Sequence, residues 1–144
     1  MAQVIEKLKE QYRGKKILVV GLGLQGGGSG VAKFFAELGS QVTVTDKKNE
    51  VILKPSLDQL KKLSVTYHLG GHNIKDFLDA DIIFKGPSVP WTLECLIQAE
   101  KKGTPIEMEL SFFARHSPAK IIGITGTRGK STTTHMIYET LQGA

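Results

Sequence analysis

The chain has 144 residues, with 40% hydrophobic and 23% charged residues and a formal net charge of +5 at pH 7. A chain of this length holds one complete domain and the beginning of a second, and its composition is ordinary for a soluble globular protein. Its one cysteine, Cys95, excludes an intrachain disulfide and lies among apolar positions of helical spacing, which favours a place in the core over a role as a nucleophile.

The first twelve residues are amphipathic and charged, and residues 4–12 have the apolar spacing of a short helix. They contain no apolar run as long as a signal peptide or a membrane span, so we expect a cytoplasmic protein without a membrane partner. The basic residues include scattered lysine pairs without interleaved aromatic residues. Solvated helix ends and loops explain this arrangement better than a nucleic-acid surface does, and we expect no nucleic-acid partner.

Residues 17–30 are the segment around which the rest of the chain is organised. An apolar run of β-branched residues stops at six glycines, and helical spacing begins directly after them, which predicts a strand, a tight turn and a helix. Gly21, Gly23 and Gly26 fit the pattern G-x-G-x-x-G, which lets the phosphates of a ligand approach the N–H groups at the start of the helix. The alternative is a glycine cluster that serves only close packing of the strand on the helix.

The next predicted strand, residues 41–46, ends at Asp46, where a carboxylate is placed to accept hydrogen bonds from a nucleoside. Helices are predicted from Pro55 onward and from a cap at Thr92 to residue 102. Further strands are predicted at residues 65–69, 81–84 and 104–107, and further helices at residues 74–78 and 108–115. This alternation predicts an α/β fold with a doubly wound, mostly parallel, five-stranded Rossmann-like sheet.

The pattern breaks near residue 117 and then begins again. Residues 120–124 predict a sixth strand, which is followed by helical spacing after the residues Gly126, Gly129, Lys130 and Ser131. In a P-loop, backbone N–H groups wrap the phosphates, the lysine reaches the outer phosphates, and the hydroxyl binds Mg²⁺. The strict Walker spacing is absent, so the loop is the shorter T-G-T-x-G-K-S variant. We therefore predict a first domain of residues 1–117, followed in residues 118–144 by the truncated beginning of an ATP-binding domain.

The segment TGTRGKSTTT after an apolar run, together with GLGLQG, VTVTDKK and a proline loop after the fourth strand, resembles the Mur ligases. These are the ATP-dependent enzymes that build the peptide of bacterial cell-wall precursors, and the chain is most similar to the members that add D-glutamate. The resemblance implies that the first domain binds the UDP part of UDP-N-acetylmuramoyl-L-alanine rather than a dinucleotide. It also implies D-glutamate as the second substrate and ATP and Mg²⁺ as cofactors, and we expect a monomer.

For the UDP site, the resemblance implies contacts from the glycine turn, the end of the second strand and the proline loop, namely Gly23, Leu24, Gln25, Asp46, Lys47, Gly86, Pro87 and Ser88. Asp46 would recognise the uracil, with Lys47 beside it. The proline loop is Gly86-Pro87-Ser88 here, where the family usually has Ser-Pro-Gly, and either Gly86 or Ser88 can still offer a backbone N–H. A plain turn rich in Pro and Gly is the alternative for this loop.

For the ATP site, the resemblance implies Gly126, Thr127, Arg128, Gly129, Lys130, Ser131 and Thr132. Lys130 is the predicted catalytic residue, because its charge would neutralise the transferred phosphoryl group, and Ser131 would bind Mg²⁺. Arg128 stands where the family commonly has Asn and is given no catalytic role. The implied reaction activates the muramoyl-alanine carboxylate as an acyl phosphate, which the D-glutamate amine then attacks. We expect no ligase turnover from this chain alone, because the rest of the enzyme would follow residue 144.

Within the ligase interpretation, members that add other amino acids and the related folate polyglutamylating enzymes stay open, because the amino-acid pocket is not in this chain. Two functions of other classes also stay open on the sequence. The NAD-binding domain of a dehydrogenase fits G-x-G-x-x-G and Asp46 but has no need of the second phosphate loop. A non-catalytic nucleotide-sensing module that gates a partner is the other alternative. The four histidines lack the spacing of a metal site, although His68 and His72 follow the third strand closely enough to be candidates for facing the ligand crevice.

Overall fold

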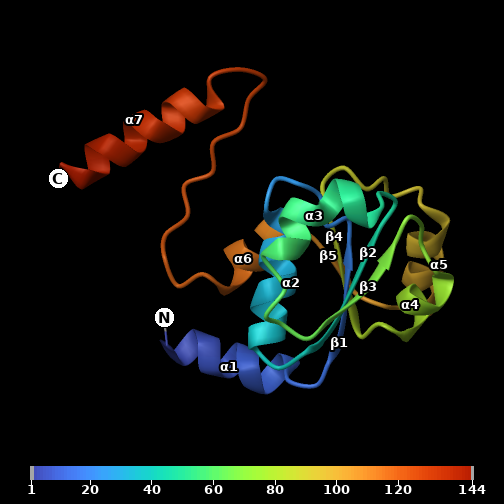
Figure 1. The fold of residues 1–144 in the computed structure, drawn as a ribbon. Helices are drawn as coiled ribbons and strands as arrows, with labels where there is room; N and C mark the ends of the chain where they lie inside the picture. The colour runs from blue at the N-terminus through green and yellow to red at the C-terminus, as the bar shows by residue number, and fades with distance from the viewer. Residues whose placement is uncertain (1, 144) are drawn as a thin grey trace.

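A parallel β-sheet forms the centre of the structure, a computed structural model that describes residues 2–143 (Figure 1). Its five strands are β1 (Lys16–Val20), β2 (Gln41–Asp46), β3 (Val65–Leu69), β4 (Ile82–Lys85) and β5 (Ile106–Glu107). They lie in the order β3-β2-β1-β4-β5, and every neighbouring pair is parallel. The predicted doubly wound α/β fold is therefore confirmed.

Helices cover both faces of this sheet (Figure 1). On one face lie α1 (Ala2–Tyr12), α2 (Gly27–Glu37), α3 (Glu50–Asp58) and α6 (Glu109–His116), and on the other lie α4 (Ile74–Asp79) and α5 (Glu94–Lys102). Alternate residues of β1 enter two separate cores, since Ile17 and Val19 pack under the first layer and Leu18 and Val20 under the second. A strand buried on both faces requires the unbroken apolar run that the sequence shows.

The start of α3 corrects the prediction of a helix that begins at Pro55. The helix begins at Glu50 because Asn49 caps it: the Asn49 side chain accepts a hydrogen bond of 3.1 Å from the N–H of Ile52. Pro55 consequently lies inside the helix rather than in its first turn.

The start of α5 also differs from the prediction of a cap at Thr92. The helix begins at Glu94, and Leu93 is the extended residue before it. Thr92 instead lies within a turn that is closed by a hydrogen bond of 3.1 Å from the Leu93 N–H to the Pro90 carbonyl.

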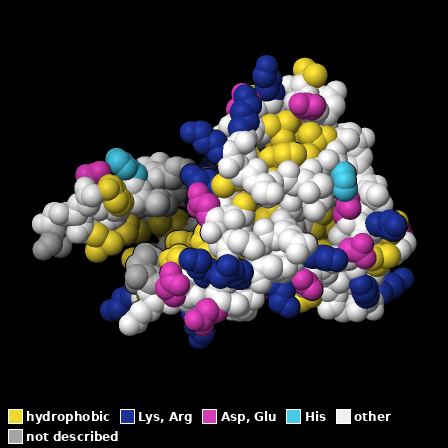
Figure 2. All heavy atoms as spheres, turned by 60° about the horizontal axis from the view of Figure 1, so that its bottom comes forward, with side chains coloured by type: hydrophobic (Ala, Val, Ile, Leu, Met, Phe, Trp, Pro, Cys, Tyr) yellow, Lys and Arg dark blue, Asp and Glu magenta, His cyan; other side chains and the backbone are white. Residues whose placement is uncertain are grey.

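The predicted sixth strand at residues 120–124 is not formed. A strand needs a partner to satisfy its backbone N–H and C=O groups, and this segment pairs with no strand among residues 2–143. Helix α7 (Lys130–Gln142) follows it and stands apart from the two layers (Figure 1). None of residues 118–143 is buried, and Figure 2 shows hydrophobic side chains on the surface of the part that carries α7. In α7, the side chains of Met136, Tyr138 and Leu141 are exposed.

Within residues 2–143, no helix combines the length and the apolar character that crossing a membrane requires.

Candidate functional site

The carboxyl ends of β1, β2 and β4 bring three loops together at one edge of the sheet. The β1–β2 ladder continues past the strands through the Gly21 N–H, which donates to the Thr45 carbonyl at 2.8 Å. The β1–β4 ladder continues likewise, because the Gly86 N–H donates to the Val20 carbonyl at 2.8 Å. Strands β2 and β3 follow on one side of β1, and β4 and β5 follow on its other side. The strand order therefore reverses at β1, and open α/β sheets bind ligands at such a switch point.

The turn after β1 depends on glycines in the left-handed region of backbone conformation. Gly23 and Gly26 have φ values of 62° and 90°, which side chains rarely tolerate. Gly26 is the N-cap of α2 and has no side chain to bond the first N–H groups of that helix. No side chain of the cap residue satisfies these N–H groups, and their use by the phosphates of a ligand stays a prediction.

Close packing of α2 on the turn depends on Gly28, which lies outside the three positions of the G-x-G-x-x-G pattern. A Cβ on Gly28 would lie 2.5 Å from the carbonyl oxygens of both Gly21 and Leu22. These are backbone atoms, which move only if the turn itself moves. The sequence contains the signal for this contact only as three consecutive glycines at the start of the helix.

Asp46 holds the glycine turn in place. Its carboxylate accepts hydrogen bonds from the N–H groups of Gly23, at 3.2 Å, and Lys48, at 2.9 Å. The Ser56 hydroxyl donates to the Gly23 carbonyl at 2.7 Å, so α3 supports the same turn. Asp46 is only 7% exposed. The structure thus gives Asp46 a positioning role, while its predicted contact with the uracil stays a prediction.

The other predicted UDP-site residues surround this turn. Leu24 and Gln25 are exposed at its tip, and Lys47 is exposed directly after β2. In the loop after β4, Pro87 and Ser88 are exposed, and the Val89 N–H closes a tight turn onto the Gly86 carbonyl at 3.1 Å. The structure therefore brings all the predicted UDP-site residues to one edge of the sheet.

His68 and His72 lie at the end of the third strand in different surroundings, with His68 inside β3 and His72 beyond it. His68 is exposed, and its Nδ1 lies 2.6 Å from the Asp76 carboxylate of α4. His72 lies beyond the end of β3, with its Nδ1 at 2.9 Å from the Thr45 hydroxyl. Burial lowers the pKa of the His72 ring below its ordinary value of 6.5, the charge of Lys47 adds to this effect, and Asp46 opposes it. Of the two, His72 lies closer to the glycine-turn edge.

Cys95 lies on α5 and is half-buried against the second core. Burial raises the pKa of its thiol, and the neighbouring Glu94 carboxylate adds to the rise. A thiol that stays protonated is a weak nucleophile. The position supports the prediction of a packing residue.

Lys85, which the sequence analysis did not select, is the last residue of β4 and is 4% exposed. Its Nζ donates a long hydrogen bond of 3.3 Å to the Gly86 carbonyl and lies 4.6 Å from the centre of the Trp91 ring. A buried lysine at the carboxyl end of a strand is unusual, because lysine is almost never fully buried unless it is paired. The only sequence signal is a charged residue directly after the apolar run IIF.

The predicted phosphate loop lies before α7, with its residues exposed. Gly129, with φ of 77°, is the N-cap of α7, and the Lys130 Nζ donates to the Gly126 carbonyl at 2.6 Å. Ser131 and Thr132 lie in the first turn of the helix, while Thr127 and Arg128 form the bend before it. The predicted helix is formed and the strand before the loop is not, while phosphate binding by this loop stays a prediction.

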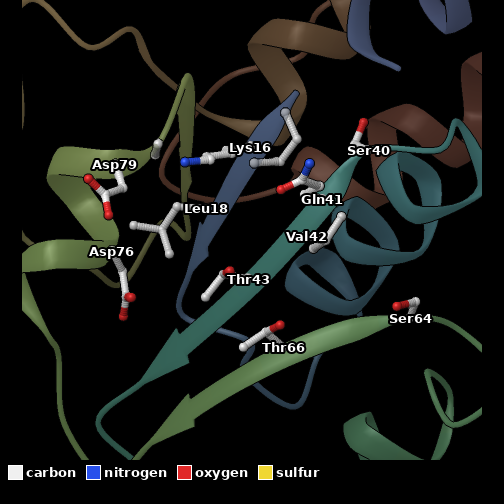
Figure 3. Close-up of a pocket in the computed structure, with 12 residues that line it drawn as sticks. Lys16, Leu18, Ser40, Gln41, Val42, Thr43, Ser64, Thr66, Asp76 and Asp79 are labelled. Atoms are coloured by element: carbon white, nitrogen blue, oxygen red, sulfur yellow. The ribbon is translucent and has the colours of Figure 1, made fainter. Parts of the chain in front are cut away.

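Two cavities lie away from the glycine turn. One, of about 410 Å³, is a groove near the amino ends of the strands, lined by residues such as Lys16, Gln41 and Ser64 (Figure 3). The other, of about 590 Å³, is apolar and lies between α1, α2 and α6. The first is at the edge of the sheet opposite the glycine turn, so it is not part of the nucleotide site that we describe.

Neither a metal cluster among the described residues nor a basic patch on the face drawn in Figure 2 marks a different site. Among residues 2–143, no group of three or more His, Cys, Asp or Glu side chains is placed to hold a metal ion. On the face shown in Figure 2, the lysine and arginine side chains are scattered over the surface. The glycine-turn edge remains the candidate site.

Comparison with known proteins identifies the family. Residues 15–107, which contain the whole sheet and the glycine turn, match the family described as the N-terminal domain of MurD-like Mur ligases. The chain belongs to this family. Both the ligase and the dehydrogenase interpretation explain G-x-G-x-x-G and Asp46. The family that matches is a Mur ligase family, so membership supports the ligase interpretation.

The chain is also similar to curated proteins that are named as ligases. The chain is 46% identical over 127 residues to a UDP-N-acetylmuramoylalanine–D-glutamate ligase of Roseiflexus sp. (strain RS-1), covering 88% of this chain and 27% of the relative. It is 36% identical over 140 residues to the ligase of the same name from Treponema pallidum (strain Nichols), covering 96% of this chain and 26% of the relative. The chain therefore spans about a quarter of the length of these relatives.

Solved structures of Mur-type ligases share the fold. A pseudomurein peptide ligase type C from Methanothermus fervidus matches with a TM-score of 0.57 and 30% identity, over 86% of this chain and 25% of that chain. The UDP-N-acetylmuramate-alanine ligase MurC from Thermotoga maritima matches with a TM-score of 0.58 and 28% identity, over 89% of this chain and 29% of that chain. The arrangement of strands and helices is thus that of Mur ligase N-terminal domains.

Proposed function

We propose that residues 1–117 form the UDP-substrate-binding domain of a Mur ligase that adds D-glutamate to UDP-N-acetylmuramoyl-L-alanine in peptidoglycan precursor synthesis. The observation that carries the proposal is the family match over residues 15–107, which coincides with the sheet and its glycine turn. The two relatives described above are named for this reaction, and they are 46% and 36% identical to the chain.

The glycine-turn edge supports binding of a nucleoside diphosphate. The uncapped N–H groups at the start of α2 and the positive end of its dipole favour phosphate oxygens. The exposed Leu24 and Gln25 would contact the nucleotide, and Asp46 and Lys47, at the end of β2, would lie beside its nucleoside. Gly86 and Ser88 would offer backbone N–H groups from the other side of the switch point.

We further propose that residues 118–144 begin an ATP-binding domain of the full-length enzyme. The loop of residues 126–129 fits a phosphate, because Gly129 starts α7 without a side-chain cap and the Lys130 ammonium already lies across the loop. Lys130 would stabilise charge on the transferred phosphoryl group, and the Ser131 hydroxyl would hold Mg²⁺. Bound ATP and Mg²⁺ would supply the phosphoryl group that activates the substrate carboxylate.

Isothermal titration calorimetry of this chain tests the substrate assignment. We expect measurable binding of UDP-N-acetylmuramoyl-L-alanine, weaker binding of NAD and no ligase turnover, because the chain spans only about a quarter of its relatives. The chain with Gly26→Val is the control, since a β-branched side chain is strained at φ of 90° and would distort the turn. Equal or tighter binding of NAD would overturn the proposal.

A further inference from the structure

Lys85 carries a buried charge without a carboxylate partner among residues 2–143. It is 4% exposed, and no ion pair of the described chain includes it. An ammonium group has three N–H donors. The one hydrogen bond found is a long one of 3.3 Å to the Gly86 carbonyl. Burial of a cation with so few partners is costly, and the cost falls sharply when an anion is supplied.

Lys85 lies at the switch point of the sheet. In the β1–β4 ladder it is paired with Val20, the last residue before the glycine turn. The loops that follow the two strands touch, since a Cβ on Gly21 would lie 3.0 Å from the Val89 side chain. Side chains alternate along a strand, and Phe84 belongs to the core under α2. Lys85 therefore approaches the edge from the α4–α5 face, opposite to α2.

Trp91 covers the Lys85 ammonium. The Nζ lies over the indole ring at 4.6 Å from its centre, a distance typical of a cation–π contact. Trp91 itself is 52% exposed and belongs to the loop between β4 and α5. The charge is thus covered by a side chain about half of whose own surface is exposed.

We propose that Lys85 binds the diphosphate of the nucleotide substrate and that Trp91 covers the charge when the site is empty of ligand. The proposal rests on the proposed function and adds to it a residue for the phosphate subsite. A diphosphate above the end of β1 would have the N–H groups of α2 on one side and the Lys85 ammonium on the other. Lysine acts on phosphate as a point charge, so no planar geometry is required.

Trp91 is the one tryptophan of the chain, so its fluorescence reports on this contact directly. We expect UDP and pyrophosphate to change the Trp91 emission, because they draw the ammonium away from the ring, and uridine to leave it nearly unchanged. In Lys85→Met, which keeps the length of the side chain without its charge, the Kd for UDP should rise about tenfold or more. Uridine affinity should stay the same, because uridine has no phosphate.

Lys61→Met is the matched control. Lys61 is exposed and pairs with Asp58 at 2.8 Å beyond the end of α3, and its loss should leave UDP binding unchanged. Melting curves of the ligand-free proteins show whether Lys85→Met folds. We expect it to be about as stable as the unsubstituted chain, because it loses one long hydrogen bond and the contact with Trp91 but no longer buries a cation that has no carboxylate partner among the described residues.

The outcomes separate the two proposals. If UDP binds the unsubstituted chain and binds Lys85→Met equally well, the role of Lys85 is wrong and the proposed function stands. If pyrophosphate and UDP leave the Trp91 emission unchanged while calorimetry detects UDP, the cover assigned to Trp91 is wrong. If UDP does not bind the unsubstituted chain at all, the proposed function fails together with the inference drawn from it.

Discussion

Glycines at the turn after β1 serve two different physical purposes. Gly23 and Gly26 are required for their backbone conformation, with φ values of 62° and 90°. Gly28 has ordinary helical conformation and is required for space, because the carbonyl oxygens of the turn lie against it. The requirement for space predicts that alanine is destabilising at Gly28 and tolerated at Gly30, two residues further along the same helix.

Gly28→Ala should destabilise the fold by about 2 kcal/mol, because its Cβ would lie 2.5 Å from two backbone oxygens and the turn would have to shift. Nucleotide binding should weaken with it, since the same turn presents the N–H groups. Urea unfolding monitored by circular dichroism measures the stability change.

Gly30→Ala is the internal control for this substitution. Gly30 lies in the same helix, is exposed, and its added Cβ would meet only the flexible Glu109 side chain, at 3.8 Å. Alanine is a better helix former than glycine, so Gly30→Ala should stabilise the chain by up to about 1 kcal/mol. Equal effects of the two substitutions would contradict the close approach at Gly28.

The sequence predicted the glycine turn but not all the residues that make it work. G-x-G-x-x-G marks conformational requirements, which repeat at fixed spacing and can be recognised. The contact at Gly28 and the support from Ser56 depend on how α2 and α3 pack, which no local pattern encodes. Lys85 was missed for a similar reason, because its burial depends on Trp91 and on the neighbouring strand.

At the scale of elements, the alternation of strands and helices was predictable while several helix starts were not. The apolar runs of β1 and β4 and the helical spacing after Gly26 mark the elements themselves. The start of α3 was harder to predict, because two residues can each mark the beginning of a helix: Asn49 as an N-cap and Pro55 as a first-turn residue. In the structure Asn49 caps the helix, and Pro55 lies inside it.

Asn49→Ala should therefore destabilise the chain by about 1 kcal/mol, because the Ile52 N–H loses its hydrogen-bond acceptor. Asn49→Asp should retain most of the stability, since a carboxylate accepts the same hydrogen bond and also suits the helix dipole. Thermal unfolding of the three proteins measures the difference. If Asn49→Ala unfolds like the unsubstituted chain, the first turn of α3 contributes nothing to stability.

On the scale of the whole molecule, stability is concentrated in the sheet and its two helical layers. The two cores include residues from α1 to α6 and none from residues 118–143. The strand predicted at residues 120–124 is not formed, because this segment has neither a neighbouring strand to pair with nor a core in which to bury its apolar side chains. An apolar run in the sequence can indicate a strand, but the strand forms only where a neighbouring strand satisfies its backbone N–H and C=O groups.

A chain that ends at residue 117 should consequently have the same thermal unfolding midpoint and the same UDP affinity as the chain of 144 residues. None of residues 118–143 is buried or belongs to either core, so their removal should change neither the cores nor the glycine-turn edge. Hydrogen exchange should also be fast throughout residues 118–143, because isolated helices such as α7 are marginally stable in water.

A chain that ends at residue 107 provides the contrast, because it also lacks α6. Phe112 of α6 is buried, and its ring lies 5.4 Å from that of Phe35 and 5.3 Å from that of Phe84. Loss of this one side chain from a core costs about 3–5 kcal/mol, so the shorter chain should unfold at a clearly lower temperature. If the chain of 117 residues also melts lower, residues 118–144 pack against the first domain in solution, and the proposed division into two domains is wrong.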